Sequence, residues 1–321
     1  MGMTGLTRMV ALFMGLLAGQ AVAQRALGLS QDNLPFQSPL RGHMRWTGNR
    51  LVGCDFCEGN AILWAVDRQG NRKFVGFEIP EAGFTDVRDV AAGPDGSLAA
   101  VGMAISGDSR MGSFIAWISS DSARQVITRV WPYSPQVVTV APDGTVWTVG
   151  AVMNDNYRQV YPNVLRHYTP SGQLLASTIV HSVRPNSGGT YQVSEVSALM
   201  ASNDRIGWLT QTCQYIEFSF EAVQLGNYTC PNGSRRIIDI GGVALSSAND
   251  MLVGKSLAPL APLELDRATN TWKLVPVSKD SGSTQKLLGF DGLTLVTAAL
   301  SQGAQWMRRY TFSDEPSPGG Q

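Results

Sequence analysis

A short motif recurs along this chain and limits the folds open to it. Residues 94–102 read PDGSLAAVG and residues 142–150 read PDGTVWTVG, so that an Asp-Gly pair precedes an apolar run ending in Gly. Related pairs precede apolar runs at four further places, namely Gly48-Asn49, Asn203-Asp204, Asn249-Asp250 and Asp291-Gly292. Such pairs supply the positive φ angles that tight β-hairpin turns require. The motif therefore predicts six copies of one small β unit.

The spacing of these turns indicates what the unit is. The second turn residues stand at positions 49, 96, 144, 204, 250 and 292, which gives intervals of 47, 48, 60, 46 and 42 residues. A period of about 40–50 residues with four strands per repeat is typical of a β-propeller. Each turn is followed by material for further strands, for example 61–66 and 73–79 in the first unit. We therefore predict an all-β, six-bladed β-propeller; the alternative is a β-sandwich with regular turns.

The last unit lacks a fourth strand of its own. After the predicted strand at 305–312 the chain enters a polar, Pro- and Gly-rich segment at 314–321, which we predict to be a disordered tail. Residues 25–29 (RALGL) can supply the missing outer strand, whereas an open row of six units would expose two sheet edges. We therefore predict one propeller domain over residues 24–313, closed by an N-terminal strand that completes the last blade.

The first 23 residues have the pattern of a signal peptide. Arg8 precedes an apolar run at 9–18, and the tripeptide AVA at 21–23 matches the small-x-small cleavage pattern. The run is shorter than the roughly 20 residues that a membrane helix needs, and no later stretch is long and apolar enough to span a membrane. The alternative is a buried core helix. We predict that residues 1–23 are removed and that the mature chain is secreted or periplasmic.

The charge balance narrows the expected partners. The chain has 25 Lys and Arg residues against 25 Asp and Glu residues, so that its formal net charge is zero. A protein that binds nucleic acid through the phosphates needs a basic excess. We therefore expect no nucleic-acid partner.

Propeller geometry separates the short turns from the longer loops. The long-loop face would carry the segments 104–113, 152–163 and 181–191, together with the crossings between units. Variable loops on a rigid scaffold commonly bind ligands, and aromatic and Arg side chains are favoured anchors. The candidate ligand-binding residues are Trp131, Tyr133, Tyr157, Arg158, Tyr161, His181, Arg184 and Tyr191. They predict a protein or saccharide partner on this face; the alternative is that they are solvated surface residues.

Four carboxylates lie near the starts of the predicted inner strands, which line the central channel: Asp86, Asp89, Glu195 and Asp239. Carboxylate oxygens could hold calcium or another divalent cation there. The alternative is that they accept hydrogen bonds from backbone donors, since no two of them occupy the same repeat position. We expect no cofactor, and a divalent cation is the alternative.

Four cysteines occur, at Cys54, Cys57, Cys213 and Cys230. An even number of cysteines in an exported protein indicates disulfides. The first two belong to the first unit and the others to the fourth, on opposite sides of the ring. These units should be about 20 Å apart from the strand spacing, whereas a disulfide needs Cα atoms within about 7 Å. We therefore predict the pairs Cys54–Cys57 and Cys213–Cys230.

The P-D-G-[ST] pattern at 94–102 and 142–150 resembles the turn–strand signature of exported bacterial propellers, among them NHL-repeat proteins and the gluconolactonase-like six-bladed group. The resemblance covers two units well and all six loosely. It implies a scaffold rather than a chemistry. Gluconolactonase-like enzymes hold a metal with acidic and amide side chains around the channel. We therefore expect an exported binding or scaffolding propeller, with a metal-dependent hydrolase, lactonase or lyase at the channel mouth as the alternative.

Overall fold

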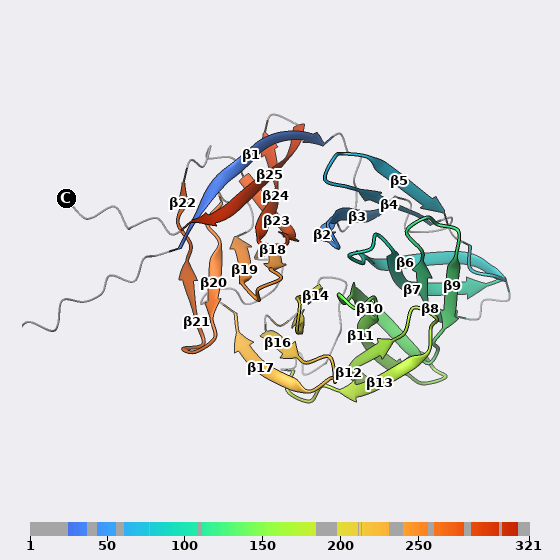
Figure 1. The fold of residues 1–321 in the computed structure, drawn as a ribbon. Helices are drawn as coiled ribbons and strands as arrows, with labels where there is room; N and C mark the ends of the chain where they lie inside the picture. Colours follow the sequence, from blue (N-terminus) through green and yellow to red (C-terminus); the bar gives the residue numbers. More distant parts are fainter. Residues whose placement is uncertain are drawn as a thin grey trace, which may run out of the picture.

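The protein is a six-bladed β-propeller, as the turn spacing predicted. Six sheets are arranged around a central axis in the computed structural model (Figure 1). The structure describes residues 25–36, 44–55, 61–76, 78–107, 111–183, 198–210, 212, 214–230, 240–255, 260–278, 284–301 and 304–313. Over these ranges no helix has the length and apolar character needed to cross a membrane. The predicted signal peptide (1–23) and tail (314–321) lie outside the described residues and stay predictions.

Each of the first five blades consists of four consecutive antiparallel strands, ordered from the axis outward. Blade 1 contains β2 (Arg45–Thr47), β3 (Arg50–Asp55), β4 (Ile62–Val66) and β5 (Arg72–Gly76). Blade 2 contains β6 (Ala82–Ala92), β7 (Leu98–Ser106), β8 (Met111–Ile118) and β9 (Gln125–Arg129). Blade 3 contains β10 (Tyr133–Val140), β11 (Val146–Met153), β12 (Gln159–Tyr168) and β13 (Leu174–Ile179). Blade 4 contains β14 (Ala198–Ala201), β15 (Ile206–Leu209), β16 (Gln214–Phe218) and β17 (Gln224–Thr229), and blade 5 contains β18 (Ile240–Leu245), β19 (Met251–Lys255), β20 (Leu263–Asp266) and β21 (Thr271–Leu274).

Blade 6 joins the two ends of the propeller. It contains β23 (Thr284–Asp291), β24 (Thr294–Ser301) and β25 (Ala304–Ser313), and β1 (Ala26–Phe36) is its fourth strand. The register runs from Ala26 opposite Ser313 to Leu29 opposite Tyr310, which confirms the predicted closure. A short strand that we did not predict, β22 (Val277–Ser278), pairs in parallel with β1. The N-terminal strand is therefore held on both of its edges.

The recurring turn has the same internal chemistry in its two best copies. The Asp95 carboxylate accepts hydrogen bonds from the backbone N–H and the hydroxyl of Ser97, at 2.9 and 2.7 Å. The Asp143 carboxylate accepts the equivalent bonds from Thr145, at 2.9 and 2.6 Å. The glycine that follows each Asp has a φ near +85°, a conformation that costs little only for glycine. The motif P-D-G-[ST] is therefore a self-capped turn.

The last glycine of the motif is required by the strand beside it. A Cβ at Gly102 would lie 1.9 Å from the backbone oxygen of Asp86, and one at Gly150 would lie 2.3 Å from that of Ser134. Both positions lie next to a register shift in the innermost strand, between Val87 and Asp89 in blade 2 and between Pro135 and Val137 in blade 3. The irregular inner strand brings its backbone into the space that a side chain would need.

The blades are held together mainly by apolar side chains from facing sheets. Trp147 of blade 3 and Trp208 and Phe218 of blade 4 belong to one buried cluster. Leu63 of blade 1 and Phe114 of blade 2 belong to another. The hydrophobic core is therefore a ring of interfaces between blades, as expected when sheets pack face to face around an axis.

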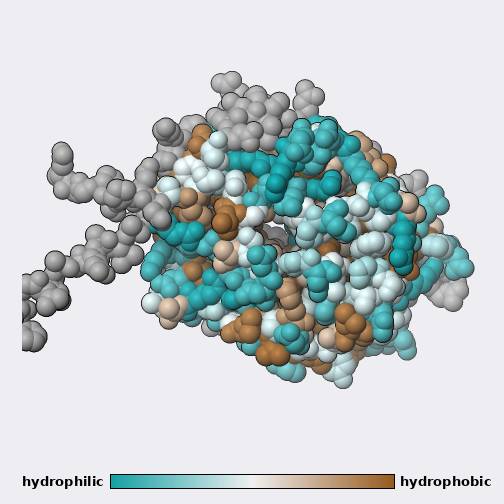
Figure 2. All heavy atoms as spheres, in the orientation of Figure 1, coloured by the Kyte–Doolittle hydropathy of each residue, from teal (hydrophilic) through white to brown (hydrophobic). Residues whose placement is uncertain are grey.

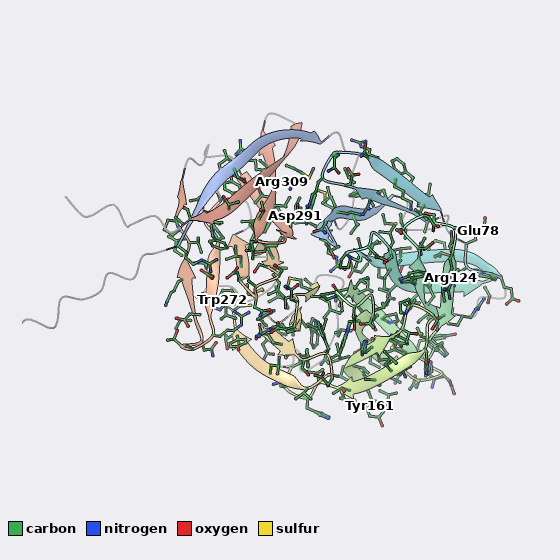
Figure 3. The ribbon with its side chains drawn as sticks, in the orientation of Figure 1. Glu78, Arg124, Tyr161, Trp272, Asp291 and Arg309 are labelled. Atoms are coloured by element: carbon green, nitrogen blue, oxygen red, sulfur yellow. The ribbon has the colours of Figure 1, made fainter. Side chains whose placement is uncertain are left out.

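Buried carboxylates link two of these interfaces. The Glu217 side chain of blade 4 is 1% exposed and accepts hydrogen bonds from Arg205 of its own blade and Arg267 of blade 5. Asp291 of blade 6 pairs likewise with Arg309 of its own blade, at 2.8 Å, and with Arg68 of blade 1. Figure 3 labels Asp291 and Arg309 close to each other in blade 6. Each carboxylate therefore has one cation from each side of its interface.

Candidate ligand-binding cavity

A cavity of about 520 Å³ lies on the propeller axis. Its walls come from the innermost strands β2, β10, β14, β18 and β23, from Asp89 of β6, and from the short turns that follow all six inner strands. These turns contribute Gly48, Pro94, Pro142, Asn203, Ser247 and Gly292. Figure 2 shows a hollow at the centre of the ring of blades. The cavity therefore lies toward the face of the short Asp-Gly turns, opposite the long-loop face on which we predicted ligand binding.

The walls of the cavity are mostly apolar. Trp46 of blade 1, Met200 of blade 4, and Leu288 and Phe290 of blade 6 line it, and glycines at 48, 242, 289 and 292 leave space between them. Gly242 and Gly289 have positive φ values of +101° and +149°, and a Cβ on either would meet a backbone oxygen of the neighbouring blade within 2.2 Å. These glycines therefore allow the inner strands to approach closely while the axis stays open.

The short turns around the cavity mouth are hydrogen-bonded from blade to blade. The Thr47 hydroxyl of blade 1 donates to the Ala92 carbonyl of blade 2 at 3.1 Å. The backbone N–H of Asn203 donates to the Ser247 carbonyl at 3.4 Å, and the N–H of Ser247 donates to the Gly292 carbonyl at 3.2 Å, linking blades 4, 5 and 6. The rim of the cavity is thus fixed by backbone contacts rather than left as mobile loops.

Arg45 crosses the channel at the inner end of the cavity. Its guanidinium donates to the Val90 carbonyl at 3.0 Å, to the Leu199 carbonyl at 2.7 Å and to the Val138 carbonyl. It also pairs with the Asp89 carboxylate at 3.0 Å. One side chain from blade 1 therefore contacts blades 2, 3 and 4. Arg45 therefore closes part of the channel. Because most of its N–H donors are already used, it has little capacity left to bind a ligand.

Lys286 is the second cation in the cavity. It lies on β23 between two buried residues, Gln285 and Leu287, and its own side chain is exposed toward the cavity. Burial by the surrounding protein lowers the pKa of its ammonium. It forms no ion pair or hydrogen bond within the part of the chain that the structure describes. Lys286 therefore presents an ammonium whose charge the described residues do not neutralise.

The predicted metal ligands do not come together. Asp89 is used by Arg45 and accepts hydrogen bonds from the N–H groups of Val90 and Val138, at 2.9 and 2.8 Å. Asp89 therefore follows the alternative to metal binding, in which the carboxylate accepts hydrogen bonds from backbone donors. Asp86 lies 3.6 Å from Arg88. Among the described residues no group of three His, Cys, Asp or Glu side chains could hold a metal ion. Glu195 and Asp239 lie outside the described residues, so a cation bound by them stays a prediction.

The predicted long-loop residues are only partly brought together. The rings of Trp131 and Tyr157 lie 5.2 Å apart, and Tyr157 is 41% exposed. Arg158 and His181 are also exposed. Arg184 and Tyr191 lie outside the residues that the structure describes. The Trp131–Tyr157 pair is thus the part of the prediction for which the structure shows a contact.

Tyr133 is a correction to the predicted set of surface ligand-binding residues. Its side chain is completely buried, and its hydroxyl forms hydrogen bonds with the Thr148 hydroxyl at 2.9 Å and the Val164 carbonyl at 3.1 Å. The Arg166 guanidinium lies 4.1 Å from the centre of its ring. Burial raises the pKa of Tyr133 far above its ordinary value. The residue belongs to the core of blade 3 because the crossing from blade 2 turns it inward.

Tyr161 lies on the outer rim instead of beside the channel, as its label in Figure 3 shows. It is 50% exposed, and exposed apolar side chains continue onto the outer strands of blades 3 and 4 at Leu174, Leu175 and Leu225. Figure 2 shows apolar patches along the same edge of the molecule. Tyr161 lies on β12, the third strand of blade 3, so that β10 and β11 separate it from the cavity.

Cys54 and Cys230 are both buried. Their predicted partners, Cys57 and Cys213, lie outside the described residues. The two disulfide pairs therefore stay predictions.

No protein-family model and no curated protein matches the chain. Solved structures with a similar fold include a protein of unknown function from Bacteroides thetaiotaomicron VPI-5482, with 9% identity and a TM-score of 0.48, covering 90% of this chain and 76% of that one. Another is the Dos1 propeller, with 11% identity and a TM-score of 0.46, covering 89% and 67%. The six blades described above, and not these distant likenesses, establish the propeller scaffold. No NHL-repeat or gluconolactonase-like family is assigned.

Proposed function

We propose that this protein is an exported binding propeller that holds a small molecule in its central cavity. The observation that carries the proposal is the cavity itself, whose volume of about 520 Å³ is lined by residues of all six blades. Ligand sites for small molecules typically occupy about 300–1,000 Å³, with mostly apolar walls and a few placed polar groups. The signal-peptide pattern at residues 1–23 supports the export part of the proposal.

A binding role fits the chemistry of the cavity better than a catalytic role. The titratable side chains that line it in the described part of the chain are Arg45, Asp89 and Lys286. Arg45 and Asp89 neutralise each other and are fixed by backbone hydrogen bonds. No second titratable group therefore remains beside Lys286 in that region to form an acid–base pair.

The proposal can be tested with a neutral apolar fluorophore, 1-aminoanthracene, added to the purified chain that begins at residue 24. We expect saturable binding with one site per chain. Met200→Trp should abolish it, because Met200 lines the cavity and the larger side chain would fill it. Leu175→Trp, on the exposed outer strand β13, is the matched control and should bind normally. Binding that survives Met200→Trp, or an absence of binding to the unaltered protein, would refute the cavity function.

The long-loop face is a second candidate surface, for a protein or saccharide. The observation that favours it is the partly exposed Trp131–Tyr157 pair, because aromatic rings are favoured anchors for such partners. Replacing Tyr157 by Ser should weaken binding of that partner without changing the binding of 1-aminoanthracene, since the two surfaces lie on opposite faces. An equal loss of both would show that the faces are not independent.

A further inference from the structure

We propose that the ligand of the central cavity is an apolar organic acid, whose single anionic group pairs with the Lys286 ammonium. This inference rests on the proposed binding function of the cavity and names the chemical class of the ligand. It follows from three observations: the charge of the cavity lining, the saturation of Arg45, and the apolar character of the remaining walls.

The charge of the lining favours an anion. Two cations and one carboxylate line the cavity in the described part of the chain, which leaves a formal charge of +1 (2 − 1 = +1). The carboxylate of Asp89 is already paired with Arg45 and hydrogen-bonded to two backbone N–H groups. The unneutralised charge is therefore located on Lys286.

An anionic ligand would relieve an unfavourable feature of the protein alone. Burial lowers the pKa of Lys286, which means that the surroundings disfavour its charged form. A charge that is partly removed from water is stabilised when a charged or hydrogen-bonding partner accompanies it. An anion beside the ammonium would provide that partner inside a cavity where charges attract more strongly than in water.

The position of Lys286 indicates how such a ligand would lie. The ammonium comes from blade 6, whereas the Arg45 network occupies the sides of the channel formed by blades 2, 3 and 4. Met200, Leu288 and Phe290 supply apolar wall to the same cavity. The body of the ligand would therefore contact apolar side chains while its acidic group points at one Lys, which excludes sugars and polycations as good ligands.

The test compares two molecules of nearly equal shape, 2-naphthoate, which carries a carboxylate at pH 7, and 2-naphthamide, which is neutral. Each is used to displace 1-aminoanthracene from the purified chain. We expect naphthoate to bind at least tenfold more tightly than naphthamide. In Lys286→Met this ratio should fall to about one, whatever the change in affinity for the amide.

Lys273→Met is the matched control, because Lys273 is 68% exposed on the outer strand β21 and pairs with Asp266, away from the axis. It should keep the preference for the acid. A ratio near one in the unaltered protein, or a ratio that Lys286→Met leaves unchanged, would overturn the acid inference while 1-aminoanthracene binding still supports the cavity. If 1-aminoanthracene itself does not bind, the cavity function falls and the acid inference falls with it.

Discussion

The Glu217 carboxylate between blades 4 and 5 offers a quantitative test of how the ring is held together. Glu217→Gln keeps the shape of the side chain and removes its charge. The carboxylate oxygens lie 2.6 and 3.0 Å from two nitrogens of Arg267, and 3.2 Å from Arg205. The change would leave two guanidinium groups facing each other across the interface without an anion between them.

The expected magnitude follows from burial. Removing one partner of a buried ion pair costs about 3–5 kcal/mol. The side chains of Arg205 and Arg267 are 21% and 25% exposed, so water relieves part of their charge, and Gln retains one acceptor oxygen. We therefore expect a loss of about 2–3 kcal/mol in the free energy of unfolding. For a domain of this size that loss lowers the Tm by roughly 4–10 °C.

Urea unfolding followed by circular dichroism measures the loss, with Glu221→Gln as control because Glu221 is an exposed carboxylate of the same blade. A Glu217→Gln protein within 0.5 kcal/mol of the unaltered one would refute the reasoning. A second arm replaces all three charges, with Glu217→Leu, Arg205→Met and Arg267→Met together. This variant should recover most of the stability, since a well-packed apolar group can replace a buried ion pair at little cost.

Two further predictions concern stability. His167 stacks on Trp147, with ring centroids 4.0 Å apart, and burial lowers its pKa below the ordinary 6.5. As the pH falls, this histidine takes up a proton in the unfolded chain before it does so in the folded protein, so the free energy of unfolding should decrease from about pH 6.5 toward the lower folded pKa. His167→Phe should flatten this part of the pH profile measured by urea unfolding. An unchanged profile would contradict the prediction. Gly150→Ala should cost at least about 2 kcal/mol through its backbone clash, whereas Gly112→Ala, whose Cβ would approach only one oxygen at 3.7 Å, should stay within about 0.5 kcal/mol in the same assay.

The features that sequence reasoning predicted correctly depend on local chemistry. The pairs at Asp95-Gly96 and Asp143-Gly144 require a positive φ and a capping carboxylate within a few residues, and both requirements are visible in the sequence. The closing strand at residues 25–29 was also predictable, because six units with one strand missing and one unassigned segment leave a single way to protect the edges.

The candidate site depends on contacts that no local pattern records. Arg45 meets Val138 and Leu199, which lie 93 and 154 residues away, only because the ring brings the inner strands together. The sequence did contain one usable signal, since Lys286 is a charged residue in an inner strand that is otherwise apolar at 287–290. Tyr133 was wrongly predicted to lie on the surface. The sequence alone does not show whether a crossing between blades turns an aromatic residue outward or into the core.

Closure of the ring pairs the first strand of the propeller with the last. β1 precedes every other strand of the propeller along the chain, whereas its antiparallel partner β25 follows all of them. Without β25, β1 has no antiparallel neighbour. Arg25, which directly precedes β1, likewise pairs with residues far along the chain, Asp250 and Glu264. A chain truncated before residue 304 would lack β25, and one edge of β1 would be left without a neighbour. The sixth blade is therefore complete only when both the first and the last strand of the propeller are present.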